Sequence, residues 1–125
     1  MNQQSSNKEI QATISITEEN IETIMSTILE DERWAIHQEE QSNWSKKPSG
    51  IYQDEWATEL LLQGETLRLT DKRNYSLCSM TLEDLLEGII LSLKEGNINL
   101  FQTVTNKSAD RIIQYALFKR ILYLT

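Results

Sequence analysis

The stretch TLRLTDKRNYSLCSMTLEDLLEGIILSL, residues 66–93, decides the fold of this chain. In its first half, apolar and polar residues alternate on both sides of Asp71–Asn74, which is the pattern of a β-hairpin over residues 66–79. In its second half, Thr81 and Asp84 have the spacing of a capping box, and leucines and isoleucines then recur at helical intervals. A hairpin followed at once by an amphipathic helix predicts an α+β domain.

Upstream of the hairpin, the sequence predicts strands and helices in alternation. Isoleucines at even positions predict a strand over about residues 9–16, and Thr17 can cap an amphipathic helix that follows it. Trp34–Ile36 predicts a short second strand, and the polar residues 41–50 predict a loop. The apolar spacing within residues 52–63 predicts a second helix.

Three glycines have predicted structural roles. Gly64 is placed to end the second helix in a left-handed conformation, and Gly96 lies where the third helix stops. Gly88 lies inside the third helix, where glycine costs about 1 kcal/mol relative to alanine. We therefore expect another element to approach Gly88 closely.

Downstream, residues 97–107 predict a loop, and Ser108 is a candidate cap for a fourth helix. Ile121–Thr125 predicts a final strand or an extension of that helix. The whole pattern predicts a single compact α+β domain over residues 9–125. Its sheet is expected to be small and mostly antiparallel, with three or four strands packed with about four helices. Residues 1–8 are polar and predict a disordered leader.

The charge of the chain is unevenly distributed. Residues 9–65 carry thirteen acids against three bases, whereas residues 66–125 carry six acids against eight bases. With a pI near 4.7, the chain has too few bases for ordinary nucleic-acid binding, and an anionic membrane would repel its first half. The acidic half favours a basic protein partner, against the simpler alternative that the charge only keeps the protein in solution.

Composition excludes several classes of protein. A single cysteine rules out an intramolecular disulfide framework. No apolar run approaches the roughly 20 residues that cross a bilayer, and the amino end lacks the apolar stretch of a signal peptide, so we expect a cytoplasmic protein of the host cell. The four glycines are dispersed and form no phosphate cradle, and we expect no cofactor.

Few residues could carry out catalysis. His37 and Cys78 are the only candidates for a zinc site or a nucleophilic pair, and we expect a surface histidine and a small buried cysteine. Pairs of acids one helical turn apart, such as Glu18 and Glu22, could share a proton in a cleft, but their helical positions flank the apolar stripe and place them in water. The sequence therefore predicts no catalytic residue, no metal ligand and no enzyme.

The predicted partner-binding site consists of the acids of the amino-terminal half and one tryptophan. These residues are Glu18, Glu19, Glu22, Glu30, Asp31, Glu32, Glu39, Glu40, Trp44, Asp54, Glu55 and Glu59. If these residues lay on one exposed face, their carboxylates would be spaced like the phosphates of a nucleic acid and could occupy the basic channel of a nucleic-acid enzyme. The alternative is an ordinary solvated acidic face.

The three tryptophans are expected to differ in role. Trp34 and Trp56 fit the core positions of their elements. Trp44 lies in the most loop-like segment, where it either anchors an interface or folds back over the core.

Four stretches resemble a group of small proteins encoded by phages, plasmids and other mobile elements of Gram-positive bacteria. They are ITEENIETIM (16–25), ATELLLQGETLRLTD (57–71), MTLEDLLEGI (80–89) and ADRIIQYALF (109–118). None is a catalytic signature, so the resemblance implies a shared architecture and a mobile-element origin. Small acidic proteins of such elements include inhibitors of bacterial defence such as anti-CRISPR proteins, which is an analogy of context and charge.

Two functions follow as expectations. The first is an acidic, anti-CRISPR-like inhibitor that binds a basic nucleic-acid-processing protein of the host and competes with DNA or RNA. The second is a structural or accessory phage protein that forms homodimers through Tyr115 and Ile121–Leu124. An enzyme that uses paired carboxylates is a third, weaker alternative.

Overall fold

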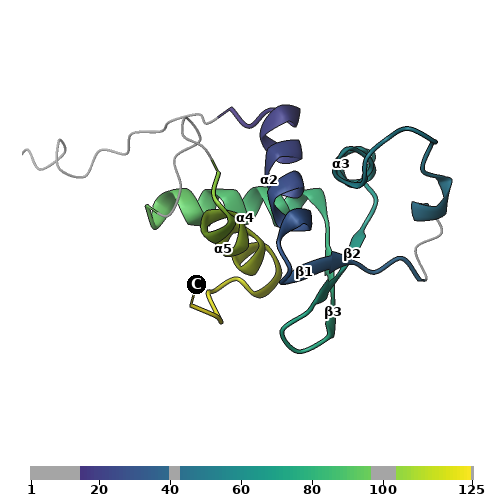
Figure 1. Cartoon of the computed structure of the whole chain (residues 1–125). Coiled ribbons are helices and arrows are strands. Elements are labelled where there is room, and N and C mark those ends of the chain that lie inside the picture. Colours follow the sequence, from purple (N-terminus) through teal and green to yellow (C-terminus); the bar gives the residue numbers. More distant parts are fainter. Residues whose placement is uncertain (1–14, 40–42, 97–103, 125) are drawn as a thin grey trace, which may run out of the picture.

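The computed structural model describes residues 15–39, 43–96 and 104–124. Its elements, in chain order (Figure 1), are α2 (Glu18–Glu30), β1 (Trp34–Ile36), the 3-10 helix η1 (Trp44–Lys46), α3 (Gln53–Leu62), β2 (Leu67–Asp71), β3 (Ser76–Met80), α4 (Leu82–Lys94) and α5 (Asn106–Phe118). The prediction of an α+β fold is confirmed: the described residues form four α-helices and one antiparallel sheet of three strands.

The sheet has the order β1-β2-β3, and the predicted hairpin supplies its central strand, β2, and one edge strand, β3. Leu67 lies opposite Met80 and Leu69 lies opposite Cys78. Leu67, Leu69 and Met80 are fully buried, whereas Leu77 on the other side of β3 is largely exposed. One face of the hairpin therefore covers the core, and the alternating side chains of the other face meet water.

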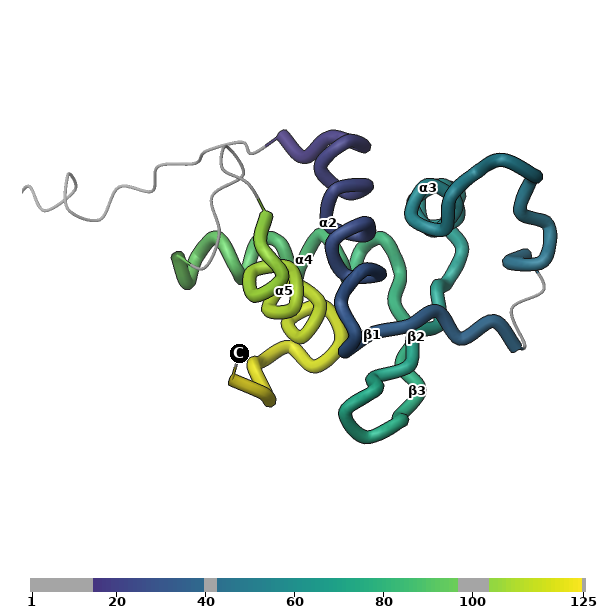
Figure 2. Tube along the Cα trace, in the orientation of Figure 1, coloured from purple at the N-terminus to yellow at the C-terminus, as the bar shows by residue number. Residues whose placement is uncertain are grey.

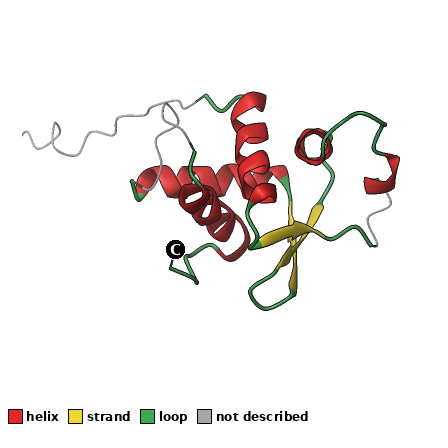
Figure 3. Ribbon diagram, in the orientation of Figure 1, coloured by secondary structure: helices red, strands yellow, loops and turns green. Residues whose placement is uncertain are grey.

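Helix α2 contacts α3 on one side and α5 on the other (Figures 2 and 3), and α4 packs mainly on α5, which it crosses closely. At that crossing, a Cβ added to Gly88 would lie 2.5 Å from the carbonyl oxygen of Ile112 and 2.9 Å from the backbone nitrogen of Ala116. The expected close approach at Gly88 is confirmed, because only a residue without a side chain allows the two helices to lie this near.

Capping residues set where the helices begin. Thr17 accepts a hydrogen bond from the backbone of Asn20, and Thr81 accepts one from the backbone of Asp84, as their sequence positions predict. The expectation for the fourth helix is wrong by one turn. Thr105 is the cap, and Ser108 is the third helical residue of a capping box, so α5 starts at Asn106.

The end of the chain differs from its predicted form. Residues 121–124 form neither a strand nor a helical extension. Lys119 has a φ of +63°, which ends α5 in a left-handed conformation and turns the chain away from the helix axis. Gly64 and Gly96 also have positive φ angles, of +89° and +73°, as predicted for residues that follow helices.

Several predicted segments fall wholly or partly outside the described residues. The leader 1–8 and most of the strand expected over 9–16 lie there, while Ser15 and Ile16 are not in a strand. Of the loop expected over 97–107, only the last four residues are described, and the last two of these already belong to α5. Within the loop expected over 41–50, Trp44–Lys46 forms the 3-10 helix.

The core lies between the sheet and the helices. Trp34 and Trp44 belong to it, with 1% and 6% of their surface exposed, and Trp56 packs against it half-buried. None of the described helices is both long enough and apolar enough to cross a bilayer.

We predict that Gly88→Ala destabilises the protein. A better helix propensity favours alanine by about 1 kcal/mol, but overpacking against the backbone of α5 costs about 1–3 kcal/mol. Urea denaturation should therefore show a lower free energy of unfolding than the wild type. The matched control is Lys94→Ala at an exposed position of the same helix, which should change stability by no more than about 0.5 kcal/mol; a Gly88→Ala variant as stable as this control would contradict the close crossing.

Candidate interaction surface

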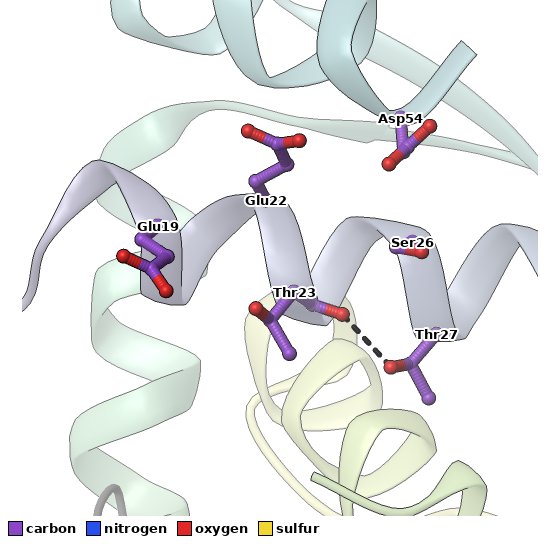
Figure 4. Close-up of a pocket in the computed structure, with 6 residues that line it drawn as sticks. All are labelled: Glu19, Glu22, Thr23, Ser26, Thr27 and Asp54. Carbon is purple, nitrogen blue, oxygen red and sulfur yellow. Dashed lines mark hydrogen bonds between the residues drawn. The ribbon is translucent and has the colours of Figure 1, made fainter. Parts of the chain in front are cut away.

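A hollow between α2 and the start of α3 brings three of the predicted acids together. It is lined by Glu19, Glu22 and Asp54, with Thr23, Ser26 and Thr27. Figure 4 shows Glu22 pointing from α2 toward α3, which carries Asp54, and the hydroxyl of Thr27 donating to the carbonyl oxygen of Thr23. We call this hollow, with its six lining residues, the acidic groove.

A second hollow lies at the carboxyl end of α2. Three predicted acids, Glu30, Asp31 and Glu32, line it, with Leu29, Gln38 and the three residues of β1. Gln53 also lines it, and the next residue, Asp54, lines the acidic groove, so the start of α3 borders both hollows. One base, Lys72, contributes to this second hollow. The negative charge of the second hollow is therefore partly compensated, whereas the lining of the acidic groove contains no base.

The three described bases of the amino-terminal half, Arg33, Lys46 and Lys47, do not line the acidic groove. Arg33 binds Asp31, Lys47 donates to the carbonyl oxygen of Ile51, and Lys46 is exposed. Among the described residues, no ion pair involves Glu19, Glu22 or Asp54. The groove thus presents uncompensated negative charge to solvent.

The other predicted acids are placed differently. Glu18, Glu39, Glu55 and Glu59 are exposed but line neither hollow, and Glu40 lies outside the described residues. Two predicted site residues are corrected. Trp44 is buried in the core, and Asp31, although it lines the second hollow, is buried and paired with Arg33, so neither adds free negative charge to the surface. For Trp44 the structure settles the two alternatives in favour of the core.

Asp31 is buried because an arginine two residues later neutralises it. The Nε of Arg33 donates to Asp31 Oδ1 at 3.0 Å, and the backbone N–H of Arg33 donates to the same oxygen at 3.0 Å. Burial alone raises the pKa of a carboxyl group, but the hydrogen bonds and charge of Arg33, with the charge of Arg73, hold the pKa of Asp31 below its ordinary value. The Asp31 carboxylate also raises the pKa of Arg33.

The hairpin repeats this arrangement. Asp71 is fully buried, and both the backbone N–H and the Nε of Arg73 donate to its Oδ1, at 3.1 and 2.9 Å. The two sequences Asp31-Glu-Arg33 and Asp71-Lys-Arg73 are adjacent in space, because β1 pairs with β2 so that Trp34 lies opposite Asp71.

Both arginines converge on a third buried acid, Asp110 of α5. Arg33 reaches Asp110 Oδ2 at 3.5 Å, and Arg73 reaches Oδ1 at 3.3 Å. The indole N–H of Trp34 donates to Oδ1 at 2.7 Å. We call these six residues, Asp31, Arg33, Trp34, Asp71, Arg73 and Asp110, the Arg–Asp network. Sequence reasoning missed it; the only signal was the repeated Asp-x-Arg, once just before β1 and once at the end of β2, which the antiparallel pairing brings to the same end of the sheet.

Catalytic chemistry finds little support in the described part of the chain. Burial raises the pKa of the Cys78 thiol, which disfavours the thiolate that a nucleophilic cysteine needs. Cys78 is half-buried, as is His37, whose backbone N–H donates to the carbonyl oxygen of Arg68. No group of three or more His, Cys, Asp or Glu residues able to hold a metal ion occurs in residues 15–39, 43–96 and 104–124.

Comparison of the chain with protein-family models, with curated proteins and with solved structures found no match.

We predict that acid weakens the fold through Asp31. The unfolded chain takes up this proton near the ordinary carboxyl pKa of 3.8, and the folded protein does so only at lower pH. The stabilisation is therefore present above pH 3.8 and is lost as the pH falls through the folded pKa. Urea titrations at a series of pH values should show that the free energy of unfolding falls less steeply with falling pH for Asp31→Asn than for the wild type. Glu59→Gln, at an exposed position of α3, is the control and should show the same dependence of the free energy of unfolding on pH as the wild type. The same dependence in all three proteins would contradict the buried ion pair.

Proposed function

We propose that this chain is an acidic inhibitor that binds a basic, nucleic-acid-binding surface of a host protein through the acidic groove and competes there with DNA or RNA. The single observation that carries the proposal is the convergence of Glu19, Glu22 and Asp54 on one hollow without a base. A mobile-element origin and an anti-CRISPR-like role are consistent with the resemblance of the sequence stretches, and both are part of the proposal.

Charge complementarity supplies the mechanism. Surfaces that bind nucleic acid are lined with lysine and arginine, because these residues displace counterions from phosphates. The carboxylates that α2 and α3 bring together can bind the lysines and arginines of such a surface in place of phosphates. Glu18, Glu55 and Glu59 on the exposed faces of the same helices add to the field and steer a basic partner toward the groove.

The proposal predicts that charge reversal in the groove weakens binding. Affinity capture from a Gram-positive host lysate at low salt should retain a basic protein, which a salt gradient elutes and added DNA displaces. Glu22→Lys and Asp54→Lys should each lower the affinity of that protein by about tenfold or more, about 1.4 kcal/mol.

Glu95→Lys is the matched control, because Glu95 is an exposed acid at the end of α4, outside both hollows. It changes the net charge by the same amount and should reduce the affinity much less. Binding that is unchanged from low to high salt, or equal losses for the groove and control variants, would reject the groove as the binding site.

Self-association is the second candidate function, and exposed leucines of the tail favour it. Leu122 is 44% exposed and Leu124 is 90% exposed, while Tyr115 is half-buried. A dimer built on this tail would cover apolar surface that the monomer leaves in water.

Sedimentation equilibrium separates the two functions. The inhibitor proposal expects a monomer for both the wild type and the double variant Leu122→Ser/Leu124→Ser. If the wild type is a dimer and the double variant is a monomer, self-association through the tail is correct.

A further inference from the structure

The carboxyl-terminal segment Arg120–Leu124, which we call the strap, is held by polar contacts of Tyr123 and of the backbone N–H of Leu122. The side-chain oxygen of Gln114 accepts hydrogen bonds from the backbone N–H groups of Leu122 and Tyr123, both at 2.8 Å. The side-chain nitrogen of Gln114 donates to the carbonyl oxygen of Tyr123 at 3.0 Å. The amide of Gln114 thus binds the backbone of Tyr123 in the way that a neighbouring β-strand would.

The side chain of Tyr123 is recognised as well as its backbone. The guanidinium of Arg73 lies 4.1 Å from the centre of the Tyr123 ring, within the range of a cation–π interaction. The side-chain nitrogen of Asn74 donates to the Tyr123 hydroxyl at 2.9 Å. We call Gln114, Arg73 and Asn74 the socket. Its contacts engage the amide, the carbonyl, the ring and the hydroxyl of one tyrosine.

Contacts that do not involve the strap hold each socket residue in place. The carboxylate of Asp110 accepts from the Gln114 amide at 2.8 Å, and Asp71 binds Arg73. The side-chain oxygen of Asn74 accepts from the backbone N–H of Ser76 at 2.9 Å. Each socket residue thus has a partner outside the strap, and such partners favour a preorganised binding site.

The strap is attached more weakly than the elements around it. It has no helical or strand hydrogen bonds to its neighbours, and its two leucines are exposed. It begins after Lys119, whose left-handed φ is unfavourable for a residue with a side chain. Local opening of such a segment costs less than unfolding of the core.

We propose that the socket is a recognition site for an extended peptide containing tyrosine, and that Tyr123 of the strap occupies it as an internal ligand that opens reversibly. The proposal is independent of the acidic groove, which lies between α2 and α3. Its ligand is defined by the contacts above: a tyrosine whose backbone N–H and C=O are both free to pair.

The test uses the full chain and a labelled, acetylated peptide of sequence KRILYLT, which matches residues 119–125. Tyr123→Ala removes the ring and the hydroxyl from the socket, weakens the hold of the strap without changing the socket residues, and should bind the peptide. The wild type should bind at least about tenfold more weakly, because its own strap competes at an effective concentration of about a millimolar. Fluorescence anisotropy measures both affinities.

Two controls define the specificity. A peptide with alanine in place of tyrosine should not bind, and Gln114→Leu combined with Tyr123→Ala should bind neither peptide. Tyr75→Ala removes an exposed tyrosine of the hairpin turn that makes no socket contact, and it should behave as the wild type does. Equal binding by Tyr123→Ala and the wild type, or equal binding of the two peptides, overturns the proposal.

Hydrogen exchange of the wild type tests the proposal even if Tyr123→Ala does not fold. The amides of Leu122 and Tyr123 should exchange at least about tenfold faster than those of Ile112 and Ile113 in α5, because the strap opens alone. Exchange of all four amides at the same rate would mean that the strap and the core unfold together, and the socket would then never be free.

Discussion

The position of Asp110 constrains the rest of this structure. This fully buried carboxylate accepts hydrogen bonds from the indole of Trp34 and from the amide of Gln114, and it forms ion pairs with Arg33 and Arg73. Burial of this carboxylate without partners would cost a large part of the free energy of folding. The fold must therefore place hydrogen-bond donors and positive charges around it. Those partners belong to the turn before β1, to β1 itself, to the hairpin turn and to α5. One side chain thereby joins elements that are far apart in the sequence.

The Arg–Asp network also shapes the charge of the surface. Arg33 is one of only three bases in residues 9–65, and buried acids engage it. Lys47 is held by a backbone carbonyl group. Two of the three bases of residues 9–65 are thus engaged elsewhere, and no described base lines the acidic groove. In the proposed function, the ion pairs of Arg33 therefore serve both the fold and the charge of the surface.

Local signals in the sequence were sufficient for much of the fold. The hairpin, the capping box at Thr81 and the close approach at Gly88 were all predictable, because each depends on residues near one another in the chain or on a property of glycine alone. The start of α5 was not, because Thr105 and Ser108 are both good caps, and only the backbone conformation of Thr105 decides between them.

The candidate site was predictable only in part. The acids of α2 were correctly expected to be exposed, but their meeting with Asp54 depends on how α2 packs against α3. In the sequence, Asp31 looks like the acids beside it. Its burial follows from its contact with Arg33, which in turn contacts Asp110, 77 residues after Arg33 in the chain. The left-handed turn at Lys119 and the capture of Tyr123 likewise depend on tertiary contacts, which residue patterns do not reveal.

The most direct measurement of the central claim is the free energy of unfolding of Asp110→Asn, determined by urea denaturation at neutral pH beside Asp84→Asn, which alters a more exposed, ion-paired acid of α4. The network predicts a loss of about 3–5 kcal/mol for Asp110→Asn, because two partly buried arginines lose the buried carboxylate that they share. A loss below about 1 kcal/mol, or one no larger than that of Asp84→Asn, would contradict the account.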